Sequence, residues 1–118
     1  MLNKEGLDAL VIKKLRLKCG EADLKEWIDL VNKEKNPKHE VKIAIVGKYV
    51  ELHDAYKSIT EALGHGGLAN DSKVHIKWVH SEEVNPDNYK ELLKDVNGII
   101  IPGGFGNRGI EGKILSAR

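Results

Sequence analysis

The chain has 118 residues, enough for one domain of ordinary size but not for two complete domains. Its 19 Lys and Arg against 18 Asp and Glu leave a net charge of +1, so charge indicates neither a nucleic acid nor an anionic membrane as partner. No apolar run approaches the roughly 20 residues that cross a bilayer, and the first ten residues lack the apolar segment of a secretory signal. One cysteine, Cys19, excludes an internal disulfide framework and fits a reducing compartment, so we expect a cytoplasmic protein.

The first 40 residues predict two helices separated by Cys19 and Gly20. Apolar residues recur in both stretches at helical spacing, and Asn36-Pro37 ends the second because the residue before proline is pushed out of the α region. Trp27 in the second helix is expected to face a core, as is Trp78 further along the chain. The two apolar stripes are Leu7, Leu10, Val11 and Leu15, followed by Leu24, Trp27, Ile28 and Val31.

The remaining residues alternate between strand and helix patterns. Apolar runs at 43–46 and 98–101 are typical of strands buried on both faces. The alternation at 74–78 predicts a half-buried strand near a sheet edge. This order predicts an α/β fold with a partial, flavodoxin-like parallel sheet preceded by a helical linker.

Helices are expected between these strands. Asp54 is predicted to cap the first of them, and the glycines at 64, 66 and 67 are predicted to end it. Asn85-Pro86 is expected to open a short helix, and residues 112–118 look like the start of another.

Three parallel strands leave an apolar sheet edge unpaired. We therefore expect the chain to self-associate, and we expect it to be part of a longer protein because the last helical pattern has no stop signal before Arg118.

The glycine-rich segment 102–109, PGGFGNRG, follows the third predicted strand and allows three interpretations. Gly104, Gly106 and Gly109 match G-x-G-x-x-G, although a dinucleotide-binding fingerprint normally follows the first strand of its sheet. Paired backbone N–H groups at Gly103 and Gly104 could instead stabilise an oxyanion during acyl transfer. The third possibility is a glycine-rich turn that only connects a strand to a helix.

The remaining motifs indicate no phosphate-binding loop, metal site or nucleophilic cysteine. Gly47-Lys48 hints at a phosphate-binding P-loop, but Lys42 stands where the upstream glycine is required and no Ser or Thr follows Lys48. The five histidines have no spacing typical of a zinc site, so no metal site is expected. Nothing around Cys19 supplies the base that a nucleophilic cysteine needs, and we interpret Cys19 as a linker residue.

Two blocks of sequence resemble one known family. They contain the motifs VGKY-x-EL-x-DAYKS, at 46–58, and PGGFG-x-RG-x-EGK, at 102–113. Both resemble the start of the class I glutamine amidotransferase domain of the CTP synthase family. The resemblance implies that residues 1–17 end a synthetase domain, that 18–40 form an interdomain linker helix, and that 41–118 form the first part of the glutaminase domain. The family pattern has proline where this chain has His53, and often lysine where it has Gly64.

The resemblance also implies roles for individual residues. Gly103 and Gly104 match the family's oxyanion and glutamine-binding positions. A further set matches positions of the lid where ammonia passes and GTP acts: Lys48, Tyr49, Asp54, Tyr56, Lys57, Phe105 and Arg108. Of these residues, Phe105 could stack on a purine ring, and Arg108 could bind a phosphate. The family's catalytic Cys, His and Glu follow the matched region, so no catalytic residue is assigned within these 118 residues.

By resemblance, the parent enzyme would be a homotetramer that converts UTP to CTP with ATP, Mg²⁺ and ammonia from glutamine, activated by GTP. The fragment alone is expected to hold no cofactor and to be inactive. The alternative is a stand-alone flavodoxin-like module that binds a nucleotide or phosphate, and a purely structural linker piece is a third possibility.

Overall fold

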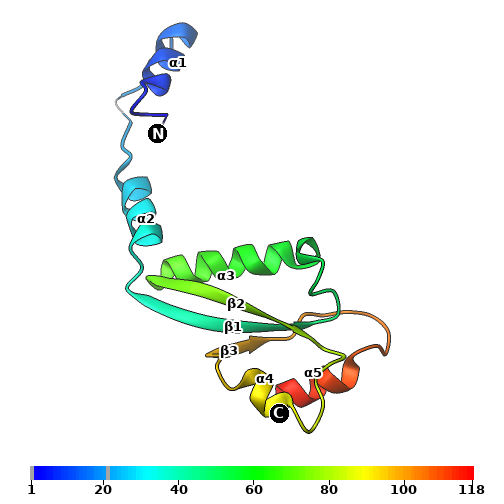
Figure 1. Ribbon diagram of the computed structural model, residues 1–118. Coiled ribbons are helices and arrows are strands. Elements are labelled where there is room, and N and C mark those ends of the chain that lie inside the picture. The colour runs from blue at the N-terminus through cyan, green and yellow to red at the C-terminus, as the bar shows by residue number, and fades with distance from the viewer. Residues whose placement is uncertain (1, 21) are drawn as a thin grey trace.

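The computed structural model describes residues 2–20 and 22–118. Two helices precede a three-stranded sheet, and the remaining helices lie against that sheet (Figure 1). The elements in chain order are α1 (Leu7–Leu15), α2 (Lys25–Lys35), β1 (His39–Gly47), a 3-10 helix (His53–Tyr56), α3 (Lys57–Ala69), β2 (Ser72–His80), α4 (Tyr89–Leu93), β3 (Gly98–Ile100) and α5 (Ile110–Ala117).

The sheet is parallel and has the strand order β2-β1-β3. β1 pairs with β2 along its whole length, from His39 opposite Ser72 to Gly47 opposite His80. On its other side β1 pairs with the short strand β3, with Ala44 opposite Ile99. β1 is thus the central strand, which is why its run of apolar residues has no polar alternation. The predicted partial α/β sheet is confirmed, and β2 is an edge strand as its alternation indicated.

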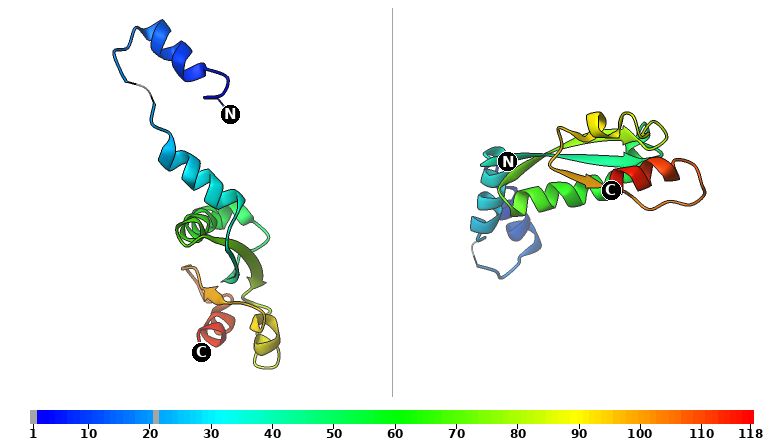
Figure 2. Two further views of the ribbon diagram at one scale, coloured as in Figure 1. Left: turned by 90° about the vertical axis from the view of Figure 1, so that its left-hand side faces the viewer. Right: turned by 90° about the horizontal axis from the view of Figure 1, so that it is seen from below.

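Helices cover both faces of the sheet. α3 lies on one face, and α4 and α5 lie on the other (Figures 1 and 2). Alternate residues of β1 supply the two cores: Ile45 packs with Tyr56, Ile59 and Leu63 on the α3 side. Ala44 and Val46 belong to the core on the α4 and α5 side. Trp78 packs against the α3-side core, as predicted.

The predicted end of α3 is wrong. Gly64, Gly66 and Gly67 lie inside the helix, which continues to Ala69. Gly67 is buried against β2, where a Cβ atom would come within 2.5 Å of the Ser72 carbonyl oxygen. Its role is therefore to let α3 approach the strand, and glycine in a helix interior does not by itself stop the helix.

The predicted cap at Asp54 is also wrong. Asp54 lies within the 3-10 helix, and Tyr56 occupies the N-cap position of α3 without a side-chain cap hydrogen bond. The 3-10 helix forms a tight turn before α3 and brings the Tyr56 side chain to the end of β1. This contact between Tyr56 and the end of β1 overrides the local preference of Asp54 for an N-cap position.

α1 and α2 form an arm that extends away from the sheet (Figure 2). The radius of gyration is 20.7 Å, against about 13 Å for a compact domain of this length. The apolar stripes of both helices are exposed, and the prediction that Trp27 faces a core is wrong because its side chain is 68% exposed. No helix in the described ranges is long and apolar enough to cross a membrane.

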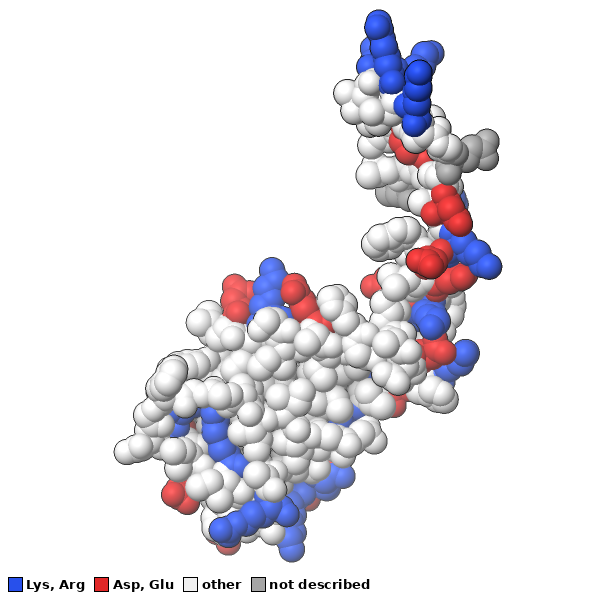
Figure 3. All heavy atoms as spheres, turned by 180° about the vertical axis from the view of Figure 1, so that it is seen from behind, with Lys and Arg blue, Asp and Glu red and all other residues white. Residues whose placement is uncertain are grey.

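Charged side chains are distributed unevenly over the surface. Seen from behind, much of the part that contains the sheet shows neither acidic nor basic atoms, whereas charges line the helical arm (Figure 3).

The accessible surface of 9257 Å² exceeds the about 6400 Å² expected for a compact monomer of this mass.

A charged cluster joins the strands at the opposite end of the sheet from the glycine-rich segment. Asp95, in the turn before β3, binds Lys42 of β1 at 2.9 Å and Lys77 of β2 at 2.5 Å. Hydrogen bonds from Lys77 and then Lys42 hold the pKa of the Asp95 carboxyl well below its usual range. Because the ionised carboxylate is favoured in the folded state, the cluster stabilises the fold above the ordinary pKa of aspartate.

Two glycines of α3 provide a matched test of helix packing. Gly67→Ala is expected to destabilise the protein by about 1–3 kcal/mol because the new methyl group collides with the Ser72 carbonyl. Gly64→Ala, which meets open space on the same helix, is expected to stabilise it by about 0.5–1 kcal/mol. Urea unfolding followed by circular dichroism measures both, and equal effects would contradict the packing role of Gly67.

Asp95→Asn is expected to lower stability at pH 7 and to reduce the loss of stability on acidification. The depressed pKa makes the unsubstituted protein lose this contribution as the pH falls below about 4, where the unfolded chain takes up the proton first. Unfolding free energies between pH 7 and pH 2 test this, with Asp87→Asn in the exposed turn before α4 as control. If the unfolding free energy of Asp95→Asn falls with pH as steeply as that of the unsubstituted protein, the stabilising role of the ionised Asp95 carboxylate is refuted.

Candidate functional site at the carboxyl edge of the sheet

The order of the strands selects one edge of the sheet as the place for a ligand. The chain runs from β1 to β2 on one side and then crosses to β3 on the other side of β1. In open parallel sheets, ligands bind outside the carboxyl ends of the strands where the chain reverses direction in this way. Here that position lies between the ends of β1 and β3, which are followed by Lys48 and by the segment 102–109.

Lys48 connects these two strand ends. Its side chain is almost completely buried, with 7% of the residue exposed. The ammonium donates hydrogen bonds to the carbonyl oxygens of Phe105 at 2.8 Å and Gly106 at 3.2 Å. Two carbonyl dipoles thus satisfy a cation that would otherwise be costly to bury.

The Tyr56 side chain supports the backbone at Lys48 and Tyr49, where the chain turns after β1. Its hydroxyl oxygen accepts hydrogen bonds from the backbone N–H groups of Lys48, at 3.0 Å, and Tyr49, at 3.2 Å. The ring reaches this position only because residue 47 is glycine, where a Cβ atom would lie 2.4 Å from the hydroxyl oxygen. Tyr56 therefore sets the path of the chain as it leaves β1.

The glycine-rich segment presents Gly103 and Gly104 at the surface. Both are exposed, and neither has a positive φ. A Cβ atom would meet nothing within 4 Å at Gly103, and only the Lys113 ammonium, at 3.6 Å, at Gly104. Internal packing therefore does not require glycine at either position. Gly106 differs, since its φ of 78° lies in the left-handed region that favours glycine.

Lys113 of α5 holds the beginning of the same segment. Its ammonium donates a hydrogen bond to the carbonyl oxygen of Pro102 at 2.8 Å. Sequence reasoning missed this residue because nothing in the pattern of α5 distinguishes Lys113 from a solvent-exposed lysine. The contact depends on how the chain turns back at Gly109, whose φ is 70°.

Two residues that were predicted to bind a nucleotide lie at the rim of this edge. Phe105 is fully exposed, with its ring in solvent. Arg108 forms an ion pair with Glu82, with 2.7 Å between Nε and Oε1, and its guanidinium lies 5.6 Å from the centre of the Tyr49 ring. Glu82 was not predicted, and only its place two residues after the end of β2 could have indicated it.

The remaining predicted lid residues lie further along the chain from the strand end. Asp54 is exposed in the 3-10 helix, and Lys57 is exposed at the first position of α3. The neighbouring His53 stacks on Trp78 of β2, with ring centres 4.5 Å apart and planes at 11°. The structure thus brings Lys48 and Tyr49 to the glycine-rich segment, places Tyr56 against the turn after β1, and leaves Asp54 and Lys57 on the outer surface.

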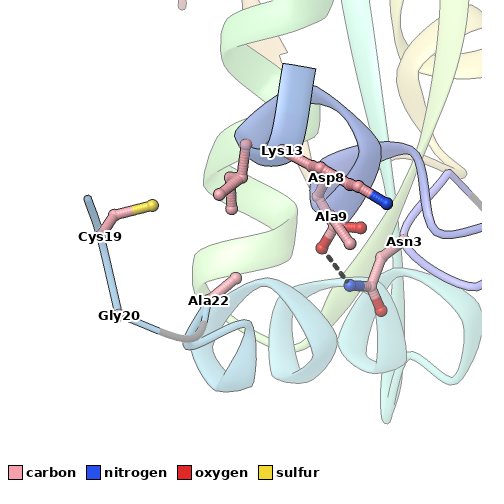
Figure 4. Close-up of a pocket in the computed structure, with 8 residues that line it drawn as sticks. Asn3, Asp8, Ala9, Lys13, Cys19, Gly20 and Ala22 are labelled. Carbon is pink, nitrogen blue, oxygen red and sulfur yellow. Dashed lines mark hydrogen bonds between the residues drawn. The ribbon is translucent and has the colours of Figure 1, made fainter. Parts of the chain in front are cut away.

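Cys19 lies in a separate hollow beside α1, distant from the carboxyl edge along the arm (Figure 4). Asn3 donates a 2.6 Å hydrogen bond to Asp8 there, which lowers the pKa of the Asp8 carboxyl. Among the described residues that line the hollow there is no histidine, so none offers an imidazole base for the Cys19 thiol. Within ranges 2–20 and 22–118, no three His, Cys, Asp or Glu side chains meet in a way that could hold a metal ion.

Comparison with known proteins identifies the class of protein to which this chain belongs. Residues 51–118 match the model of the family "Glutamine amidotransferase class-I". The chain therefore belongs to the class I glutamine amidotransferase family. Its first part, including β1 and Lys48, lies before the matched range.

The resemblance to CTP synthases is confirmed over the whole chain. The chain is 63% identical to the CTP synthase of Clostridium kluyveri over 117 residues and 60% identical to that of Clostridium beijerinckii over 118 residues. It covers 22% of the length of each of these relatives, and the alignments cover 99% and 100% of this chain.

A solved structure gives the same family. The glutaminase domain of Trypanosoma brucei CTPS, with bound acivicin, matches with a TM-score of 0.58 and 41% identity. The match covers 65% of this chain and 31% of that chain. The stand-alone nucleotide-binding module is therefore not the interpretation that the comparisons favour.

Replacing Tyr56 by Phe is expected to destabilise the protein by about 1–3 kcal/mol. The substitution leaves the ring in place but removes the acceptor of two backbone N–H groups, one of them buried. Tyr89→Phe on α4 is the matched control, because its ring packs in the other core and no hydrogen bond of its hydroxyl is seen within the described residues. Equal unfolding free energies for the two variants would show that the Tyr56 hydroxyl does not support the turn.

Proposed function

We propose that this chain is part of a cytoplasmic CTP synthase, and that its carboxyl edge contributes to the site where glutamine is hydrolysed. The identity of 60–63% with CTP synthases across nearly the whole chain carries the proposal. The whole enzyme would use ATP and the released ammonia to convert UTP into CTP.

Gly103 and Gly104 are proposed to bind glutamine and to stabilise the oxyanion that forms at its amide carbon. Backbone N–H groups serve this purpose when they lie about 3 Å from the developing negative charge. The exposure of both residues supports this role, because a substrate can approach their backbone without meeting a side chain. The nucleophile and its base would come from residues outside the chain described above.

The rim residues are proposed to respond to GTP. The exposed Phe105 ring offers a face for a purine, and Arg108 offers a guanidinium for a phosphate. Lys48, Tyr49, Asp54, Tyr56 and Lys57 would connect this response to the passage of ammonia.

ATP and Mg²⁺ are assigned to the synthetase half of the enzyme. The described residues bring together no acidic cluster that fits a divalent cation, so the residues that hold Mg²⁺ would belong to the synthetase half. Homotetrameric assembly of the whole enzyme remains part of the same proposal.

Gly104→Val in the full-length protein tests this function. Glutamine-dependent CTP formation is expected to fall by about 100-fold, because the side chain obstructs the glutamine site and displaces an oxyanion donor. Ammonia-dependent formation is expected to persist, since added ammonia bypasses this loop. Open space and an ordinary φ at Gly104 mean that the fold should tolerate the substitution.

Gly20→Val in the linker, which also meets open space, is the control and should affect neither nitrogen source. An equal loss of both activities by a folded Gly104→Val enzyme would mean that the segment is only a structural turn.

A further inference from the structure

Two lysines turn the carbonyl groups of the glycine-rich segment toward the interior. Lys48 binds the carbonyl oxygens of Phe105 and Gly106, and Lys113 binds that of Pro102. These three carbonyl groups belong to one short loop. The two lysines lie far apart in the sequence, because Lys48 follows β1 and Lys113 belongs to α5.

The direction of each carbonyl fixes the direction of the next amide. In a planar trans peptide unit the C=O and N–H bonds point in opposite directions, and no cis peptide occurs in the described residues. The N–H groups of Gly103, Gly106 and Asn107 therefore point away from the lysines that hold the preceding carbonyls. A loop that must meet an oxyanion needs its N–H groups, and not its carbonyls, on the outer side.

We propose that Lys48 is a positioning residue, assisted by Lys113, which orients the peptide units of the segment 102–107 for glutamine hydrolysis. This inference rests on the proposed function of the carboxyl edge. It gives Lys48 a different role from contact with a nucleotide, because a residue that is 7% exposed has little surface to offer a ligand.

The burial of Lys48 explains why its effect should be strong. Hydrogen bonds from a charged donor are stronger than neutral ones, and removing the ammonium leaves two carbonyl oxygens without that partner. The same contact connects the segment after β1 to the segment after β3. Movement of the turn at Lys48 would therefore pull on Phe105 and Gly106, directly after the proposed oxyanion donors Gly103 and Gly104, whereas Lys113 holds the peptide unit that contains the Gly103 N–H.

Lys48→Met in the full-length protein tests the proposal, because methionine keeps most of the apolar stem and removes all three N–H donors. The kcat of glutamine hydrolysis is expected to fall by about tenfold or more, with little change in KM and with ammonia-dependent CTP formation retained. Lys73→Met, on the exposed part of edge strand β2, is the matched control and should leave both activities unchanged.

Chymotrypsin gives a second measurement that does not depend on enzymatic activity. Cleavage after Phe105 requires its carbonyl group, which Lys48 holds in the folded protein. Lys48→Met is expected to accelerate this cleavage by about tenfold, and Lys73→Met is expected not to. Lys113→Met, which frees the Pro102 carbonyl, should change both measurements in the same direction and replaces Lys48→Met if that variant does not fold.

Unchanged cleavage at Phe105 together with an unchanged kcat in Lys48→Met would overturn the proposal. An equal loss of glutamine-dependent and ammonia-dependent CTP formation would overturn it as well. If the unsubstituted protein hydrolyses no glutamine, the proposed function fails. The rate of cleavage at Phe105 then decides alone whether Lys48 holds the segment.

Discussion

The burial of β1 on both faces is the constraint on which the other contacts of the sheet depend. Ala44, Ile45 and Val46 are completely inaccessible to solvent, and their alternate side chains form the centres of two separate cores. Within this buried stretch any polar side chain would need a buried partner, so polar side chains of β1 lie in its exposed first part or follow its end. The first residue after β1 is Lys48, and the structure provides that partner in the carbonyls of the glycine-rich segment.

The end of β2 is joined to the end of β1 through Ser81. Its backbone N–H donates a 2.8 Å hydrogen bond to the Gly47 carbonyl directly after β2. The first turn of α5 lies so close to Ser81 that a Cβ atom at Gly109 would be 2.3 Å from its hydroxyl oxygen, and one at Gly112 would be 1.9 Å from its carbonyl oxygen. Glycine at both positions lets α5 sit against the end of β2, and this places Lys113 beside Pro102.

Local patterns in the sequence were sufficient for the order of the elements but not for contacts between them. The apolar run at 43–46 and the alternation at 74–78 gave correct strands because burial on two faces or on one produces different periods. Gly67 misled the prediction because a glycine that admits a neighbouring strand looks the same in sequence as one that ends a helix. Trp27 misled it because helical periodicity reports an apolar face, whereas nothing in the described ranges covers that face enough to bury the side chain.

The candidate site was predictable to the extent that its motif recurs in a family. The segment 102–109 and the residues around Lys48 were found from motifs, but the hydrogen bonds between them span 57 and 58 residues and have no local signal. Lys113 and Glu82 were missed for the same reason.

The glycines of the chain separate into those that the fold requires and those that it does not. Gly47, Gly67, Gly109 and Gly112 each lie against an atom that a Cβ would strike, and Gly106 has a positive φ. Gly103 and Gly104 have neither property, although open space alone is not informative because Gly64 shares it. The difference is their position beside peptide units that two lysines hold with carbonyls inward. At such a position glycine leaves the approach to the backbone N–H groups open from outside, which the proposed binding of glutamine would require and the packing of the fold does not.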